Sequence, residues 1–171
     1  MKPVLGFLAS IALLIQAPCL AQGQPSSSAA TRIQSDQLQH DDQRQVTVFS
    51  GNVSLTRDGL VLNGDRLELT QRSDGSSVAI LNGRPARFTQ QRVGSSDRIQ
   101  GSSGRLEYDS KTEIVVLIGA AQLRRSRGDR MLDEVVGDQV TYNTPTETYE
   151  VKTSQGQGRA QMTLMPREAK P

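Results

Sequence analysis

The chain has 171 residues, a formal net charge of +2, one histidine and one cysteine. This length is typical of one domain. The near-neutral charge balance excludes a general nucleic-acid binder, which needs a clear basic excess. With a single histidine and a single cysteine, the chain offers little for a metal cluster or for thiol chemistry.

The first residues are typical of a secretory signal sequence. Lys2 precedes an apolar run at 4–15, and a segment that contains Pro18 and ends at Ala21 follows it. We predict cleavage after Ala21, so residues 1–21 are lost and the mature chain depends on a buried core rather than on a disulfide. An uncleaved membrane anchor is the alternative, although this apolar run is shorter than the ~20 residues of a spanning helix.

We predict one folded domain at residues 31–166. The segment QGQPSSSAA at 22–30 is polar and rich in small residues, which is typical of a disordered linker. The last residues, 167–171, are expected to form a flexible tail.

Alternation of apolar and polar residues dominates the domain. It begins at Val46 and Val48 and is still present at Val140 and Tyr142, and such a pattern predicts strands with one buried face. No segment of the mature chain keeps a helical period over three turns, so we predict an all-β fold. Turn-forming sequences separate the strands, and they lie at 56–59, 72–75, 109–112 and 143–146.

One phrase of about eight residues occurs four times, as IQSDQLQH at 33–40, LNGDRLEL at 62–69, IQGSSGRLEY at 99–108 and VVGDQVTY at 135–142. Each copy is read as a strand with a small or acidic centre. A second strand follows, and in the first three units we expect it to end at Gly51, Gly83 or Gly119. A period of about 30 to 38 residues is typical of repeat architectures. We therefore predict a stack of strand–turn–strand units, with bends or bulges at these glycines.

Catalytic and metal-binding chemistry is sparse. His40 stands beside Asp41 and Asp42 in what is read as an exposed turn, which makes a hydrolase or metal site built on it the weaker interpretation. Asp65 and Asp138 lack the dense acidic spacing of a calcium-binding repeat, and no glycine-rich loop opens a helix. We predict a protein that is not an enzyme and that has no cofactor and no metal.

The segment LRRSRGDR at 123–130 is locally basic. A charge run of this kind is typically a solvated loop, and we favour that interpretation. A surface that contacts anionic head groups is the alternative.

Residues 48–70, with the sequence VFSGNVSLTRDGLVLNGDRLELT, resemble the OstA-like, or LptA, family of periplasmic lipopolysaccharide-transport proteins. The resemblance extends in order over about 31–166. It continues in LNGRPARFTQ at 81–90, GSSGRLEYDSKTEIVVLIGAAQL at 101–123, GDQVTYN at 137–143 and GRAQMTLMP at 158–166. One departure is Ala120, which stands where the family usually has Asn.

The resemblance implies an extended, twisted β-jellyroll, open at both ends, in the periplasm of a Gram-negative bacterium. It also implies a carrier that passes lipopolysaccharide from an inner-membrane complex to an outer-membrane translocon, with the acyl chains in an apolar interior. The implied partners are an inner-membrane LptC-like protein, an outer-membrane LptD-like protein and further copies of the chain. A shielded path is needed, because ~12 methylenes in water cost about 10 kcal/mol at ~0.8 kcal/mol each.

We expect alternating apolar residues to line this interior, although alternation alone does not separate lining from packed core. They are Val48, Val53, Leu55, Leu62, Leu67, Leu69, Phe88, Leu106, Tyr108, Val116, Ile118, Leu123, Val140 and Tyr142. The inter-chain edges are expected at 33–38 and 159–164. Their named residues are Ile33, Leu38, Arg159, Met162 and Leu164.

Two other interpretations stay open. A membrane-anchored LptC-like partner of the same system would share the fold and keep its N-terminal helix. A structural β-repeat protein would have a dry core and no cargo.

Overall fold

The computed structural model describes residues 30–91, 96–154 and 158–166. Over these ranges the chain forms ten strands and no helix, so the all-β prediction is confirmed. The strands are β1 (Arg32–Gln34), β2 (Gln37–Asp41), β3 (Val46–Arg57), β4 (Leu60–Gln71), β5 (Ser77–Gln91), β6 (Asp97–Asp109), β7 (Ile114–Arg127), β8 (Arg130–Asn143), β9 (Thr148–Lys152) and β10 (Gln161–Leu164). In the described ranges there is consequently no helix that could cross a membrane. The expected signal sequence, all of the linker but Ala30, and the tail lie outside the described residues.

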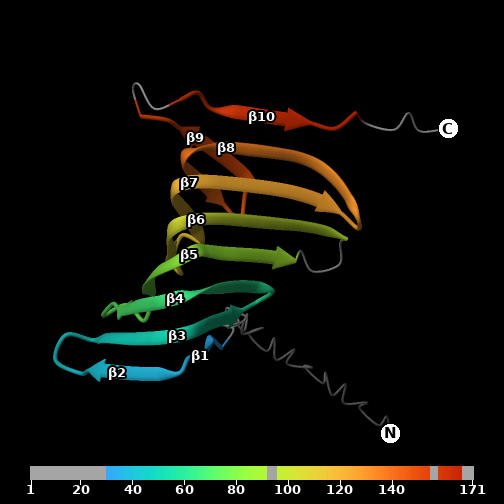
Figure 1. Cartoon of the computed structure of the whole chain (residues 1–171). Coiled ribbons are helices and arrows are strands. Elements are labelled where there is room, and N and C mark those ends of the chain that lie inside the picture. Colours follow the sequence, from blue (N-terminus) through green and yellow to red (C-terminus); the bar gives the residue numbers. More distant parts are fainter. Residues whose placement is uncertain (1–29, 92–95, 155–157, 167–171) are drawn as a thin grey trace, which may run out of the picture.

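The strands form one antiparallel sheet that follows the chain. From β3 to β8 each strand pairs with the next through a hairpin, and Figure 1 shows them stacked in sequence order. The predicted turns lie at these hairpins or within a residue of them. At one end β1 and β2 both pair with β3, and at the other end β9 and β10 both pair with β8. The sheet therefore has two free edges, each made of two short strands.

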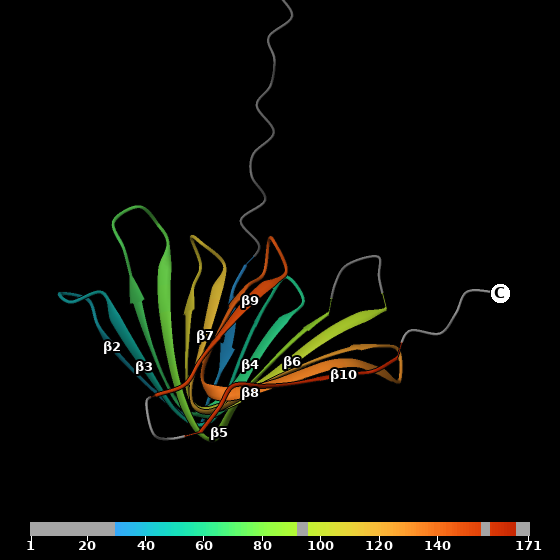
Figure 2. The ribbon, with the colours of Figure 1, turned by 90° about the horizontal axis from the view of Figure 1, so that it is seen from above.

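A crease crosses the middle of every long strand. The pairing register shifts there, between Ser50 and Val53, Asn63 and Arg66, Asn82 and Ala86, Ser102 and Arg105, and Ile118 and Ala121. Extra residues at such shifts bend a strand and increase its twist. Figure 2 shows the result, in which the strand halves spread into two arms from a common line.

We call the two arms the wings. The first wing holds the strand halves that end at turns 72–76, 110–113 and 144–147, together with β2 and β9. The second wing holds the halves that end at turns 58–59 and 128–129, together with β1 and β10. Each long strand contributes to both wings, so the V is made by one sheet folded along the crease.

The repeated phrase encodes this crease. Its small centre lies at the register shift in β4 and β6, and in the first copy it is the break between β1 and β2. Gly64 shows why the centre is small, since a Cβ there would lie 2.8 Å from the carbonyl oxygen of Asn82. The bulges expected at Gly51, Gly83 and Gly119 are confirmed. The expectation that strands end at these glycines is wrong, because each strand continues through its bulge into the other wing.

One apolar cluster fills the space between the wings. Leu62, Leu81, Leu106 and Leu117 are inaccessible to solvent, and each such side chain contributes roughly 1.5–3 kcal/mol relative to an exposed position. The rings of Phe88 and Tyr142 stack with their centroids 6.1 Å apart, and they come from opposite wings. The wings are therefore held together by direct packing along their inner faces.

Candidate functional site

The inner faces of the wings hold most of the residues expected to line an apolar interior. Buried there are Val53, Leu55, Leu62, Leu67, Phe88, Leu106, Tyr108, Leu123, Val140 and Tyr142. Leu69 is partly buried and packs against the same cluster. Alternation thus identified the inner face correctly in β4, β6 and β8 and in half of β3, β5 and β7.

Val48, Val116 and Ile118 lie on the outer face instead. Phe49, next to Val48, is buried, and so are Val115 and Leu117 beside Val116 and Ile118. Consecutive residues of a strand point to opposite faces. Val116 pairs with Glu107 in β6, and Ile118 pairs with Arg105. The residues at 114–118 are all apolar, so their own sequence shows no alternation, but the partner strand RLEY does and would have given the correct register.

Several inner-face residues were missing from the predicted lining, although Leu60 and Ala86 belong to the alternating pattern. The missing residues are Phe49, Leu60, Ala79, Leu81, Ala86, Val115, Leu117, Ala121 and Val135. In β5 the inner positions change from odd to even numbers at the crease, with Leu81 on one side of it and Ala86 on the other. A two-residue period followed straight through the strand therefore misplaces one half of it.

The interior changes character from the crease to the free ends of the second wing. We call the row beside the crease the floor; it is apolar, as Leu62 and Ala121 show. We call the inner positions near turns 58–59 and 128–129 the mouth. There the inner positions are occupied by polar instead of apolar residues. The mouth is formed by Arg57, Gln90, Arg125 and Asp133. The interior is consequently a wedge with an apolar base and an amphipathic opening.

The most buried charge of the mouth is Asp133, with 3% of its surface exposed. Both of its carboxylate oxygens accept hydrogen bonds of 2.9 Å from Nε of Arg125, an arrangement that gives charge-assisted bonds. The hydrogen bond to Asp133 raises the pKa of Arg125. The guanidinium carbon lies 5.9 Å from the ring centre of Tyr149 in β9, so the pair connects the two wings at the C-terminal end of the interior.

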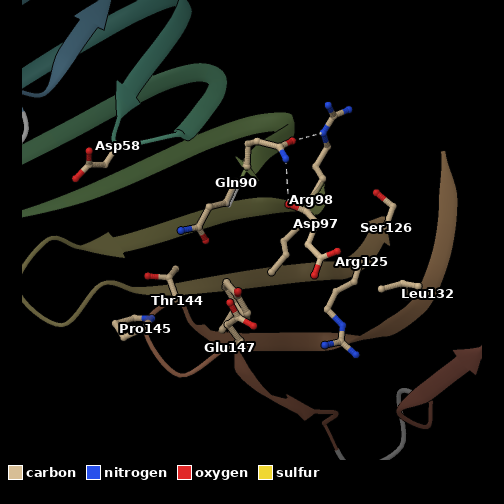
Figure 3. A pocket seen from close by; sticks show the side chains of 13 residues that line it. Asp58, Gln90, Asp97, Arg98, Arg125, Ser126, Leu132, Thr144, Pro145 and Glu147 are labelled. Atoms are coloured by element: carbon tan, nitrogen blue, oxygen red, sulfur yellow. Dashed lines mark hydrogen bonds between the residues drawn. The ribbon is translucent and has the colours of Figure 1, made fainter. Parts of the chain in front are cut away.

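Two cavities open between the wings at the mouth. One of about 200 Å³ is lined by residues from 90–91, 97–99, 125–132 and 142–147, and Figure 3 shows that these side chains come from both wings. A second, of about 280 Å³, lies between Arg57 of the second wing and Tyr108 of the first. Asp58, Gln90 and Thr144 line both cavities. The cavities are therefore adjacent parts of one opening.

Tyr108 marks the boundary between floor and mouth. Burial raises the pKa of its phenol, while the nearby positive charge of Arg57 lowers it. Glu113 and Asp58 act on the same phenol in the raising direction. The buried ring of Tyr108 in the first wing therefore lies near Arg57 and Asp58, the charged residues at turn 58–59 of the second wing.

The basic segment at 123–130 is the end of β7 and its turn, so the loop interpretation is wrong. Its arginines have acidic partners on neighbouring strands, with 2.7 Å between Arg124 and Glu134 and 2.5 Å between Arg127 and Asp97. Exposed pairs of this kind contribute only ~0–1 kcal/mol each. The positive charge is largely neutralised in place, which weakens the alternative of an anion-contacting surface.

The expected inter-chain residues lie at the two edges of the sheet. Ile33 is in β1 and packs against the core, and Leu38 is in β2 with 59% of its surface exposed. At the other edge Met162 and Leu164 are in β10, and Leu164 is 66% exposed. Arg159 lies just before β10 and is exposed. The large apolar residues that are exposed in the described ranges all lie at these two edges, with Val136 and Met165 beside β10.

His40 lies in strand β2 rather than in a turn, and it is exposed. Its Nδ1 is 2.8 Å from Oγ1 of Thr47 on β3, and its Nε2 is 3.8 Å from Asp42. The described part of the chain contains no group of three or more metal-ligating side chains. The ring is therefore held at the edge of the sheet by a hydrogen bond to the neighbouring strand.

The comparisons with known proteins agree with this architecture. Residues 32–148 match the family model described as "LptA/(LptD N-terminal domain) LPS transport protein". The chain is 26% identical over 136 residues to the lipopolysaccharide export system protein LptA of Escherichia coli K12, which covers 78% of this chain and 70% of that protein. The LptA of Haemophilus influenzae is 25% identical over 140 residues, covering 78% and 74%.

A solved structure has the same fold. It is LptH of Pseudomonas aeruginosa, described as the LptA-homologous periplasmic component of the conserved lipopolysaccharide transport device. It superimposes with a TM-score of 0.73 at 25% identity, covering 83% of this chain and all of the other.

Proposed function

Because this chain belongs to the LptA/(LptD N-terminal domain) family of LPS transport proteins, we propose that it carries lipopolysaccharide between two membranes with the acyl chains held between its wings. The observation that supports this most directly is the wedge-shaped interior, apolar at the floor and polar at the mouth. An acyl chain fits the floor, and its polar head group fits the mouth. Moving acyl chains out of water at ~0.8 kcal/mol per methylene supplies the free energy for binding.

Lipid entry requires the wings to separate. Floor residues such as Leu106 and Leu117 are fully buried against the opposite wing, so an acyl chain replaces contacts that the wings make with each other. Since both sets of contacts are apolar, the exchange costs little beyond the opening itself. At the mouth the wings are already separated by cavities of about 200 and about 280 Å³, which gives the opening a place to begin.

The free edges of the sheet suit partner binding by strand addition. Each edge presents unpaired backbone groups and exposed apolar side chains, Leu38 at one edge and Met162 and Leu164 at the other. The two edges differ, so pairing between copies is head to tail, which extends into a filament wherever the rotation between copies does not close a ring. We propose that the chain pairs in this way with copies of itself, with an inner-membrane LptC-like protein and with an outer-membrane LptD-like protein.

We further propose a periplasmic location after cleavage of residues 1–21, and no enzymatic activity. The relatives are named as transport proteins, which is consistent with the scarcity of catalytic side chains in the described interior. The intact mass of the secreted protein tests the first point. A chain that begins at Gln22 supports cleavage, whereas retention of residues 1–21 supports the anchored, LptC-like alternative.

Photo-crosslinking tests lipid binding between the wings. Azidophenylalanine replaces Phe88 or Tyr142, one aromatic ring for another, and Val116 on the outer face serves as the matched control position. We expect lipopolysaccharide adducts at Phe88 and Tyr142 and none at Val116. Adducts at none of the positions in a folded, secreted protein would favour the structural repeat with a dry core.

A further inference from the structure

Gln90 is a polar side chain in a place where the alternation calls for an apolar one. It follows Ala86 and Phe88 along the inner face of β5. Its Oε1 is buried, and it has no hydrogen-bond partner among the described residues. Buried polar atoms in folded proteins are almost always paired, because an unpaired acceptor loses its hydration without compensation. An acceptor left in this state is suited to a ligand that brings a donor.

The surroundings of Gln90 are suited to such a ligand. Gln90 lines both mouth cavities, so the residue borders open space on two sides. Figure 3 shows Gln90 on β5 and Thr144 and Pro145 on the opposite wing around the same space. Ile99 and Tyr142 add apolar surface to the lining. The site therefore combines an unpaired acceptor with walls that would hold an alkyl segment.

The position along the strand indicates which part of a lipid would lie there. Phe88 is two residues closer to the floor, which corresponds to ~7 Å along a strand at ~3.3 Å per residue. The side chain of Phe88 is buried among the apolar cluster. A chain with its methylenes at Phe88 would present the atoms near its carboxyl end to Gln90.

We propose that Gln90 recognises a hydrogen-bond donor near the carboxyl end of a bound acyl chain, either a hydroxyl on the chain or the amide N–H that joins the chain to a sugar. This inference rests on the proposed function, because it names the part of the lipid that the mouth selects. An anionic group fits the same place poorly. Asp58, Asp97 and Glu147 line the cavity. Of the two arginines in the lining, Arg125 is engaged by Asp133 and Nε of Arg98 donates to Oε1 of Gln91.

Three synthetic glycolipids that share one sugar test this recognition. They carry a tetradecanoyl ester, a tetradecanoyl amide or a 3-hydroxytetradecanoyl ester, so only the donor differs. For the unmodified protein we expect the amide, the hydroxy ester or both to bind about threefold to tenfold more tightly than the plain ester, as one added hydrogen bond gives. The lipid that gains identifies the donor.

Variants assign the preference to the side chain. Gln90→Met keeps the length of the side chain without the acceptor and is expected to bind all three lipids equally. Its free form should also melt at a higher temperature, because the unpaired polar atom is gone. Gln100→Met, on the exposed outer face of β6, is the matched control and should change neither property.

The outcomes separate this inference from the proposed function. Equal binding of the three lipids by the unmodified protein, or an unchanged preference in Gln90→Met, overturns the role of Gln90 and leaves lipid carriage intact. Failure of the unmodified protein to bind any of the three contradicts lipid carriage itself.

Discussion

Where the crease crosses β3 and β7, the two strands have the same backbone conformation but different surroundings. In each, a glycine and the next residue have positive φ, 80° and 47° for Gly51 and Asn52, and 81° and 50° for Gly119 and Ala120. Around Gly51, the backbone N–H of Asp36 donates to the glycine carbonyl at 2.9 Å, and Nδ2 of Asn52 donates to Oδ2 of Asp36 at 2.8 Å. A Cβ on Gly119 would have no described atom within 4 Å.

The shared backbone shows what the crease itself requires. Two successive left-handed residues occur whether or not anything packs on them, so the conformation belongs to the bulge that turns each strand into the other wing. The contacts of Asp36 are an addition made only at the N-terminal end. They tie the break between β1 and β2 to the body of the sheet, and so hold the first edge in place.

The largest effect is expected for Gly51→Val. A β-branched residue at φ +80° is strained, and its Cβ would overlap Oδ2 of Asp36. We expect a loss of more than about 2 kcal/mol in the free energy of unfolding, measured by urea denaturation. Hydrogen exchange should also show lost protection in β1 and β2. An unchanged midpoint and unchanged protection would contradict the role given to this crease.

Gly119→Val is expected to have a smaller effect. The backbone strain is the same, but the added side chain meets open space. We expect a loss of about 1–3 kcal/mol, which is the usual cost of such strain, and no change of protection in β1 and β2. The difference between the two valine variants measures the contribution of the Asp36 contact. If Gly119→Val were as damaging as Gly51→Val, the surroundings would not distinguish the two creases.

Asn52→Ala is expected to cost about 1 kcal/mol. It removes one hydrogen bond to Asp36 and places alanine in a left-handed conformation that asparagine tolerates better. Thermal denaturation measures the loss. Asp36→Ala should have a similar effect, and the double variant should cost less than the sum of the two, since both changes break the same contact.

The fold was predicted well from the sequence because the repeated units contain both the alternation of the strands and the glycines of the bulges. Alternation identified the strands, and the matched glycines Gly51, Gly83 and Gly119 located bulges in β3, β5 and β7. Alternation failed in two circumstances. The apolar run 114–118 has no polar residue to mark a face, and the residues inserted at the crease of β5 change the inner positions between Leu81 and Ala86.

The candidate site was predicted only in its apolar half. In the sequence, a polar side chain at an inner position cannot be distinguished from one that marks the end of a strand. Gln90, Arg125 and Asp133 therefore did not indicate a polar opening of the interior. Their common position emerges only when β5, β7 and β8 are folded along the same crease. The pairing of Arg125 with Asp133 also required the register of β7 against β8, in which the two residues are direct partners.

The smallest expected effect is a gain, in Ala120→Asn. Ala120 is exposed and has φ +50°, a region in which asparagine is favoured several-fold among non-glycine residues. Asparagine stands at the matching position of β3, as Asn52. Since β6 has Ser103 and Gly104 at this crease rather than an acidic residue like Asp36, we expect the gain to come from the backbone and to be about 0.5 kcal/mol, seen as a small rise in the thermal midpoint. A gain as large as the loss in Asn52→Ala would mean that the asparagine backbone preference, and not the Asp36 contact, accounts for the difference between the creases.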